Sequence, residues 1–507
     1  MGAFHTTPKQ IAFWFAASLL PIGVQAQNST DAFLFSNANN TVTARAVGVG
    51  NAMSAVGGDL HTASTNPAGL GIYRRGEFVF SPGIAVINTE ATFGADKLND
   101  QRTVFSGGGL GFVAPTLLEN PASKWKSVNF GLAFNHLAGF GQTTSFSGVS
   151  KGSRLLTIAQ NAQGKSIPEL GYFEEELAYS TYLMSLANAQ DSSTFTYTPA
   201  LTEQNFVRKS QYIKQTGGIN ELAISLAGNY NNRLHIGGTI GINFLRYKEF
   251  KSYEELEETG SIDFKKMVLD ETREVKGTGI NLKLGLLYRI NKYFRLSAHV
   301  HTPTAFGNRE TYSTKMYGEV YFDTSLQKNT YESIATGNYP YGYRTPAVFG
   351  IGAAAVIKTY GFISGEVEAV NYANNRFKVS VMDTAATIAT RQYMETLTGN
   401  VQGTYKSAYR VKVGTEWVIK DYRLRAGYQM QTSPYQQTWS DIKNLRQVLS
   451  IGAGVRHDAV FFDVAYQHIL SDFDYYPYSG SSANNIQRVT GKMTRGHLLL
   501  TLGIRMN

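Results

Sequence analysis

The sequence predicts an all-β fold, a transmembrane antiparallel barrel of about 14 strands. Three observations lead to that prediction. Stretches of about ten residues alternate apolar with polar side chains, as the strands of such barrels do. Very short breaks alternate along the chain with long polar connections. The composition suits strands and tight turns, because the 507 residues include 30 Tyr, 29 Phe and 50 Gly.

Residues 1–26 are predicted to be a cleaved signal peptide. Lys9 precedes an apolar run from Ile11 to Leu20, and Val24-Gln25-Ala26 has the small-x-small pattern of a cleavage site. The run is too short to span a bilayer, which needs roughly 20 apolar residues. We therefore expect export, with cleavage after Ala26.

Residues 27–75 precede the first predicted strand and lack its alternation. They are rich in Gly, Ala and small polar residues. A barrel of about 14 strands has a lumen too wide for its own side chains to fill. We therefore predict that this segment is a compact plug, or hatch, inside the barrel. A disordered periplasmic leader is the alternative.

Residues 76–507 are predicted to form the barrel itself, and the last strand alternates most clearly. Leu498 and Leu502 lie on one face, whereas His497 and Arg505 lie on the other. An ionic side chain facing lipid at mid-depth costs about 2–4 kcal/mol, so the charged face should line the lumen. A soluble β-sandwich would show the same alternation, and a mean hydropathy of −0.21 fits a secreted protein as well.

Turn lengths distinguish the two folds. Short breaks, such as 231–233 and 420–421, alternate with long polar connections near 250–275 and 378–404. Outer-membrane barrels have short periplasmic turns and long extracellular loops. The prediction is therefore a multi-pass protein of the cell outer membrane, which contacts outer-membrane lipid and is inserted by the outer-membrane assembly machinery.

The longest insert, 141–218, breaks the strand pattern. Within it, 167–189 contains helix-compatible stretches, so we expect an extracellular loop that is partly helical. Loops of this length are usually functional or disordered. Another protein is a candidate partner at this loop.

Composition also limits the chemistry. The chain has no Cys, which removes disulfides, thiol catalysis and Cys-based metal sites. The net charge of +9 is spread without the basic run typical of nucleic-acid binding. No Gly-x-Ser-x-Gly run indicates a nucleophile elbow. His299 and His301 share a lumen face, but no further metal ligand can be assigned. We predict no enzymatic activity, no cofactor, no metal and no nucleic-acid partner.

A set of residues in the predicted hatch carries a family resemblance. They are Arg45, Gly48, Gly50, Asp59, Asn66, Pro67, Ala68 and Gly69. Together they look like the hatch of the FadL/TodX outer-membrane transporters of long-chain fatty acids and aromatic hydrocarbons. Weaker matches in later strands, such as Tyr343-Arg344-Thr345-Pro346, extend the resemblance over essentially the whole mature chain.

The resemblance implies a passive channel for a hydrophobic small-molecule ligand, gated by the hatch. It also implies a kink in the third strand, through which ligand can leave sideways into the bilayer. The third strand would run over about 128–140 here, with Gly139-Phe140-Gly141 at its end. Gly tolerates a bend or bulge, so a kink is expected, but the sequence does not place it.

Candidate ligand contacts come from aromatic residues and from lumen-facing cations. Phe33 and Phe35 fall near the mature N-terminus, where a pocket-contacting aromatic would lie in the family, and Phe140 ends the third strand. The cations, which could pair with a ligand carboxylate, are Arg410, Lys412, Arg423 and Arg425. Plug packing is the alternative for Phe33 and Phe35, and salt bridges to the hatch or to Glu416 are the alternative for the cations.

Two other functions remain open at this stage. A FadL-like barrel could act as a protein-binding scaffold or secretion shuttle, similar to the type IX shuttle proteins of Bacteroidota. An adhesin or haem-binding surface protein is suggested only by the long loops. Uptake of labelled oleate or toluene separates the channel from both.

Overall fold

The structure is a computed structural model. It describes residues 29–38, 40–120, 122–188, 194–258, 260, 263–322, 325–333, 336–380, 387–436, 445–478 and 488–506. The predicted signal peptide, 1–26, lies outside the described residues. Within these ranges, no helix is both long enough and apolar enough to cross a bilayer.

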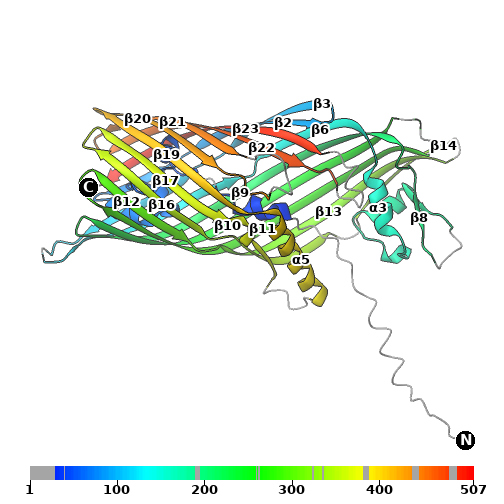
Figure 1. The fold of residues 1–507 in the computed structure, drawn as a ribbon, viewed down its shortest axis with the longest axis horizontal. Helices are drawn as coiled ribbons and strands as arrows, with labels where there is room; N and C mark the ends of the chain where they lie inside the picture. The colour runs from blue at the N-terminus through cyan, green and yellow to red at the C-terminus, as the bar shows by residue number, and fades with distance from the viewer. Residues whose placement is uncertain are drawn as a thin grey trace, which may run out of the picture.

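Fourteen antiparallel strands close into a barrel, which confirms the predicted fold class. Closure comes from the pairing of the first strand segment, β1 (Gly76–Phe80), with the last strand, β23 (Val489–Met506). Closure gives most strands of the ring a hydrogen-bonded neighbour on each side, which satisfies the backbone groups of the wall inside a bilayer. The C-terminus lies at the same end of the barrel as the start of β1 (Figure 1).

Seven further strands of the ring run without a break. They are β9 (Phe206–Tyr230), β10 (Leu234–Glu257), β11 (Phe264–Arg289), β19 (Ser407–Ile419), β20 (Tyr422–Gln431), β21 (Arg446–His457) and β22 (Val460–Tyr475).

The other strands of the ring are interrupted, so each consists of two segments. The pairs of segments are β1 with β2 (Gly83–Phe93), β3 (Asp96–Phe105) with β4 (Gly109–Leu117), β5 (Trp125–Gly139) with β6 (Gln142–Lys151), β12 (Phe294–His301) with β13 (Ala305–Phe322), β15 (Gly337–Arg344) with β16 (Val348–Ile357), and β17 (Gly361–Asn371) with β18 (Arg376–Val379). Pro82, Pro303 and Pro346 lie at three of these breaks, because proline cannot donate a ladder hydrogen bond. A short turn, η4 (Tyr372–Asn374), separates β17 from β18.

An apolar band surrounds the barrel. Its exposed side chains include Phe130, Ile240, Leu284, Ile351, Val413, Leu424, Ile451, Leu498 and Leu502. The residues next to them along each strand point inward; Leu499, between two band residues, is 0% exposed. An apolar surface that encircles a closed barrel must be covered by the lipid of a bilayer. The protein is therefore a multi-pass outer-membrane barrel, as predicted.

The two ends of the barrel differ. At one end, tight turns join the strands, and Asn231 and Asn232 adopt positive φ angles of 54° and 55° in one of them. At the other end, β9, β10 and β11 continue far beyond the band, and the helix α3 (Arg154–Ala162) lies there (Figure 1). By the rule of short periplasmic turns, this second end is extracellular.

The extracellular insert is shorter than the predicted 141–218. β6 and the first half of β9 occupy its two ends and pair with each other, so only 152–205 lies outside the barrel wall. These strand segments extend above the lipid, where no apolar face is required, and so they lack the alternation that identifies the others.

The non-barrel part of the insert is a small folded module. It comprises α3 (Arg154–Ala162), η3 (Ile167–Glu169), α4 (Glu175–Ser180), β7 (Met184–Leu186) and β8 (Tyr197–Pro199). Leu155 and Leu177 are fully buried in a cluster shared with β10, β11 and β13. Arg154 binds Glu174 at 2.7 Å and Glu271 at 3.1 Å, which fixes the module to the wall. A further segment, β14 (Ser325–Glu332), pairs with β13 nearby.

One helix was not predicted. α5 (Ile388–Thr404) lies in the connection that was read only as a long polar loop. Met394, Leu397 and Val401 recur at helical spacing, and their side chains are buried against the hatch. The sequence has apolar residues at helical spacing, but they are few and lie among many polar residues, so the pattern does not stand out.

Candidate functional site

The N-terminal segment lies inside the barrel. Its elements are α1 (Ser29–Ser36), α2 (Ala44–Gly48), η1 (Leu60–Ser64) and η2 (Pro67–Ile72), drawn in blue in Figure 1. α2 contacts β20, β21, β22 and β23, whereas η2 contacts β5, β9, β10 and β11 on the other side of the lumen. Residues 41–73 are buried almost throughout. We call residues 29–75 the hatch from here on.

The polar residues of the resemblance shape the hatch itself. Asp59 accepts hydrogen bonds from the Thr43 hydroxyl at 2.7 Å and from the His61 amide at 2.9 Å, so it joins α2 to η1. The Asn66 side chain caps η2 by accepting from the Ala68 amide at 3.2 Å. Pro67 follows at the first position of η2, where its missing N–H is not needed.

Two of the predicted glycines are needed for conformation or space. Gly50 has a φ of +63° and packs against the backbone of Gly427 in β20. A Cβ on Gly69 would lie 2.8 Å from the side chain of Thr62, so any larger residue would separate η1 from η2. Gly48 ends α2 beside Arg425.

A buried ionic cluster joins the hatch to the wall. Arg45 binds Glu416 at 2.9 Å, and Glu416 also binds Arg425 at 2.6 Å. Arg425 in turn binds Asp463 at 2.7 Å. Burial alone would lower the pKa of Arg45, but the charge of Glu416 beside it holds that pKa above its ordinary value. The guanidinium therefore stays charged inside the lumen.

The other predicted cations are also engaged by the protein. Lys412 binds Glu366 and Glu368, each at 2.8 Å. Arg410 lies 3.5 Å from Glu368. Arg423 donates to the carbonyl of Lys420 at 2.7 Å, in a periplasmic turn. Arg425 is thus in the salt bridge to Glu416 that the sequence left open as the alternative, whereas Arg410 and Lys412 pair with wall carboxylates that the sequence analysis did not name.

A group of possible metal ligands is part of this network. His299, Glu366 and Glu368 offer ligand atoms within 4.8 Å of one another. The Lys412 ammonium already contacts both carboxylates, which supplies the cation that the pair requires. The ring of His301 lies tilted beside that of His299, with centroids 5.2 Å apart, and His301 donates to the carbonyl of Thr65 at 2.6 Å. His301 therefore connects the wall to the hatch.

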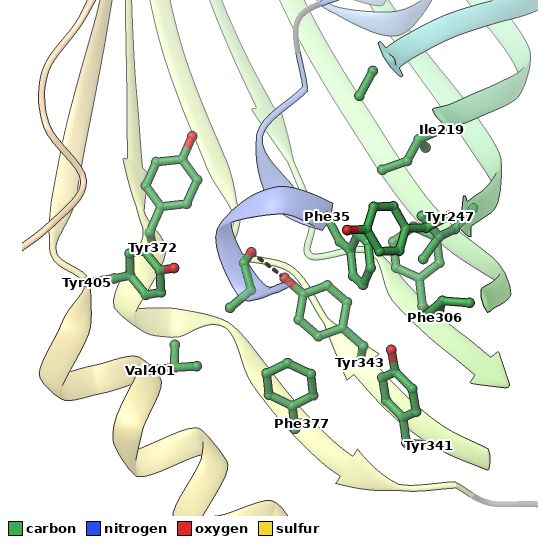
Figure 2. Close-up of a cluster of buried hydrophobic side chains, with 14 of the residues drawn as sticks. Phe35, Ile219, Tyr247, Phe306, Tyr341, Tyr343, Tyr372, Phe377, Val401 and Tyr405 are labelled. Atoms are coloured by element: carbon green, nitrogen blue, oxygen red, sulfur yellow. Dashed lines mark hydrogen bonds between the residues drawn. The ribbon is translucent and has the colours of Figure 1, made fainter. Parts of the chain in front are cut away.

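α1 is held in an aromatic cluster, shown in Figure 2. The ring of Phe35 lies 5.9 Å from Phe140 and 5.6 Å from Tyr247. The Tyr343 hydroxyl donates to the carbonyl of Ala32 at 2.7 Å. Phe35 is only 2% exposed, so it packs the plug, which was the alternative considered for it.

A cavity of about 270 Å³ lies above α1, near the extracellular end of the lumen. Phe33, Leu34 and Asn37 of the hatch contribute to its floor. The rest of its lining is mixed: apolar residues such as Ala138, Phe140, Ile469, Phe473 and Met493 alternate with polar ones such as Gln142, Gln215, Gln431, Asp472 and Asp474. The volume is close to the lower limit for small-molecule sites, and the mixture of apolar walls with a few polar groups is typical of them. Phe33 and Phe140, both predicted as ligand contacts, meet in this cavity.

Two arginines that the sequence analysis missed also line the cavity. Arg446 begins β21, and Arg495 lies in β23, where it donates to the carbonyl of Gly139 at 3.1 Å. Among the described residues, neither arginine forms an ion pair; Asp474, at the rim, pairs with Arg488 at 3.6 Å. Alternation from His497 places Arg495 on the lumen face, but whether an arginine has an acidic partner depends on strands distant in sequence.

The break in the third strand lies at the edge of the cavity. The register of β5 against β9 shifts between His136 and Ala138, and the strand is interrupted at Phe140 and Gly141. The structure therefore has a kink at the glycines that end the predicted third strand.

Beyond this kink, the third strand separates from the second. β4 pairs with β5 as far as Gly109 and Asn135, but no ladder joins β3 to β6, both of which are described in full. Side chains bridge them instead: Arg102 donates to the carbonyl of Gln142 at 3.2 Å, and Asp100 accepts from the amide of Ser145 at 2.5 Å. We call this boundary the seam.

Comparison with known proteins identifies solved structures of the same architecture. No protein-family model and no curated protein matches the chain. The structure of a Pseudomonas aeruginosa FadL homologue matches 92% of this chain and 98% of its own, with 13% identity and a TM-score of 0.52. That of the P. putida toluene transporter TodX matches 92% and 99%, with 11% identity and a TM-score of 0.50. The chain therefore has the FadL/TodX fold, as the resemblance in its hatch implied.

Proposed function

We propose that the protein is a passive outer-membrane channel for hydrophobic compounds, and that its preferred ligand carries an anionic head, as a long-chain fatty acid does. The observation that supports this most is the cavity, where apolar walls meet Arg446 and Arg495. Each buried CH₂ contributes about 0.8 kcal/mol, so the walls favour an alkyl chain. Both arginines are half-buried and form no ion pair among the described residues, so a ligand carboxylate would supply the counter-charge that they lack.

The arginines give a test of the ligand class. With Arg446→Gln and Arg495→Gln combined, we expect oleate to bind at least about tenfold more weakly, since a hydrogen bond to a charged group contributes about 1.5–3 kcal/mol. Binding of toluene, which has no charge, should change little. Titration of labelled oleate and toluene against the purified protein measures both. Arg423→Gln is the control, because that arginine lies at the periplasmic start of β20 and does not line the cavity. Equal oleate affinity in the double variant and the wild type would contradict the proposal.

In the proposed route, ligand enters the cavity from the extracellular side and leaves when the hatch moves. The seam offers the lateral exit. The seam meets the cavity at Gln142, which also lines the cavity. On the other side of the seam, Val104 is followed by Phe105, whose side chain is 78% exposed next to the apolar band. A ligand that leaves here enters the outer leaflet without crossing a water-filled pore.

A disulfide across the seam tests the lateral exit. A Cβ built on Gly141 lies 3.5 Å from the Cβ of Val104, which suits a disulfide. The chain has no other Cys, so Val104→Cys with Gly141→Cys forms a single defined bridge. We expect oxidation to slow oleate uptake by cells severalfold and reduction to restore it. Each single-Cys variant is the matched control, and uptake that is indifferent to oxidation of the pair would exclude exit at the seam.

A further inference from the structure

Basic side chains gather on the outer surface of the barrel, just above the apolar band on its extracellular side. They come from β9, β10, β11, β13, β15 and β18, and all of them are exposed. We call them the basic belt: Lys214, Arg246, Lys248, Lys276, Arg309, Arg344 and Lys378.

The strand register places like charges directly opposite one another. Arg246 in β10 is the partner of Lys276 in β11, and Lys276 is the partner of Arg309 in β13. All three point outward, because Leu245 and Val275 beside them are buried. Side chains in directly opposed positions have Cβ atoms about 4.5–5.5 Å apart, and like charges there destabilise a sheet. An anion bound between these side chains would attract all three of them and so offset their mutual repulsion.

The protein itself supplies little compensation. Among the described residues, only Lys276 of the belt forms an ion pair, with Glu274 at 2.8 Å. Higher on the same strands, basic residues are paired: Lys266 with Glu254 and Lys315 with Glu332, each at 2.7 Å.

The opposite side of the barrel is balanced as well. There, Lys492 in β23 lies opposite Glu90 in β2 and Asp472 in β22. At that position, unlike in the belt, each register partner of the basic residue is acidic.

The height of the belt identifies the layer that it faces. Phe244 and Ile280 are outward apolar residues at the upper edge of the band, 38% and 59% exposed. Arg246 and Lys276 follow two and four residues further out on their strands. At about 3.4 Å per residue along strands tilted by about 35–45°, they lie roughly 5–11 Å above the hydrocarbon edge. This is the headgroup layer, or its outer rim.

We propose that the basic belt binds the phosphate groups of a phosphorylated glycolipid of the outer leaflet, of the lipid A type. Arginine and lysine bind phosphate through short charge-assisted hydrogen bonds, and basic clusters at a membrane surface attract anionic headgroups. Arg246, Lys276 and Arg309 form the centre of the site. The lipid would hold β10, β11 and β13, the strands that carry the extracellular module, at a fixed height in the leaflet.

The test uses the full-length protein in detergent micelles, with bisphosphorylated lipid A as the probe and native mass spectrometry as the readout. Arg246→Gln, Lys276→Gln and Arg309→Gln are combined in the belt variant. Lys266→Gln, Lys315→Gln and Lys328→Gln are combined in the control, which removes the same charge from the same region of the wall. We expect lipid A to bind the belt variant at least about tenfold more weakly, and the control as it binds the wild type.

Two further probes separate the lipid from other sources of phosphate. Dephosphorylated lipid A should bind all three proteins weakly, and inorganic pyrophosphate should compete only at concentrations far above that of lipid A. Equal losses in the belt variant and the control would overturn the proposal, since charge alone would then explain binding. So would wild-type affinity for the dephosphorylated lipid, or displacement by pyrophosphate at the concentration of lipid A.

Discussion

Replacing Glu416 with glutamine should release the hatch from the barrel wall. Glu416 is the one carboxylate within hydrogen-bonding distance of Arg45 among the described residues, and it also binds Arg425. Glutamine keeps the shape but removes the charge, which leaves the largely buried Arg45 without its hydrogen-bonded counter-ion. Removing one partner of a buried ion pair costs about 3–5 kcal/mol. Because 1.4 kcal/mol is a factor of ten, the population of released hatch should rise about 100-fold or more.

Hydrogen exchange of the hatch amides measures this release. We expect the backbone of 44–58 to exchange at least about 100-fold faster in Glu416→Gln, while the strands of the wall keep their protection. Glu332→Gln is the matched control, since Glu332 pairs with Lys315 on the surface, where an ion pair contributes about 0–1 kcal/mol. Unchanged exchange in Glu416→Gln would mean that apolar packing alone retains the hatch.

The barrel could be predicted from the sequence because a bilayer imposes its pattern on every strand. Wherever a strand crosses lipid, as at Leu498 to Met506, outward residues are apolar and the alternation is plain. Above the lipid that constraint ends. β6 was therefore read as part of a loop, and the inward-facing residues of α5, such as Leu397, were overlooked.

The hatch could be predicted because its small and capping residues have local roles. Asp59 and Asn66 each bond to an amide two residues ahead, a short-range pattern that survives in the sequence. The ligand site could not be predicted in the same way. Arg425 and Arg495 are both inward-facing arginines, and only the closed barrel shows that one has carboxylate partners and the other lines a cavity.

In the proposed mechanism, ligand passes only when the hatch moves, and a reversible lock between hatch and wall tests this. Ser54 of the hatch and Ser297 of β12 are both buried, with their hydroxyl oxygens 3.0 Å apart. Cysteine sulfurs that replace these two oxygens would start close together, and a disulfide would bring them to about 2.0 Å. The native chain has no Cys, so Ser54→Cys with Ser297→Cys creates one bridge between hatch and wall.

The deciding measurement is uptake of radiolabelled oleate by cells that carry this double variant, before and after reduction. We expect the oxidised protein to transport at least about tenfold more slowly than the reduced one, because the bridge removes the open state. Reduction should restore the wild-type rate, and the single variants Ser54→Cys and Ser297→Cys should not respond to oxidant. If the bridged protein takes up oleate as fast as the reduced protein, the hatch is not the gate.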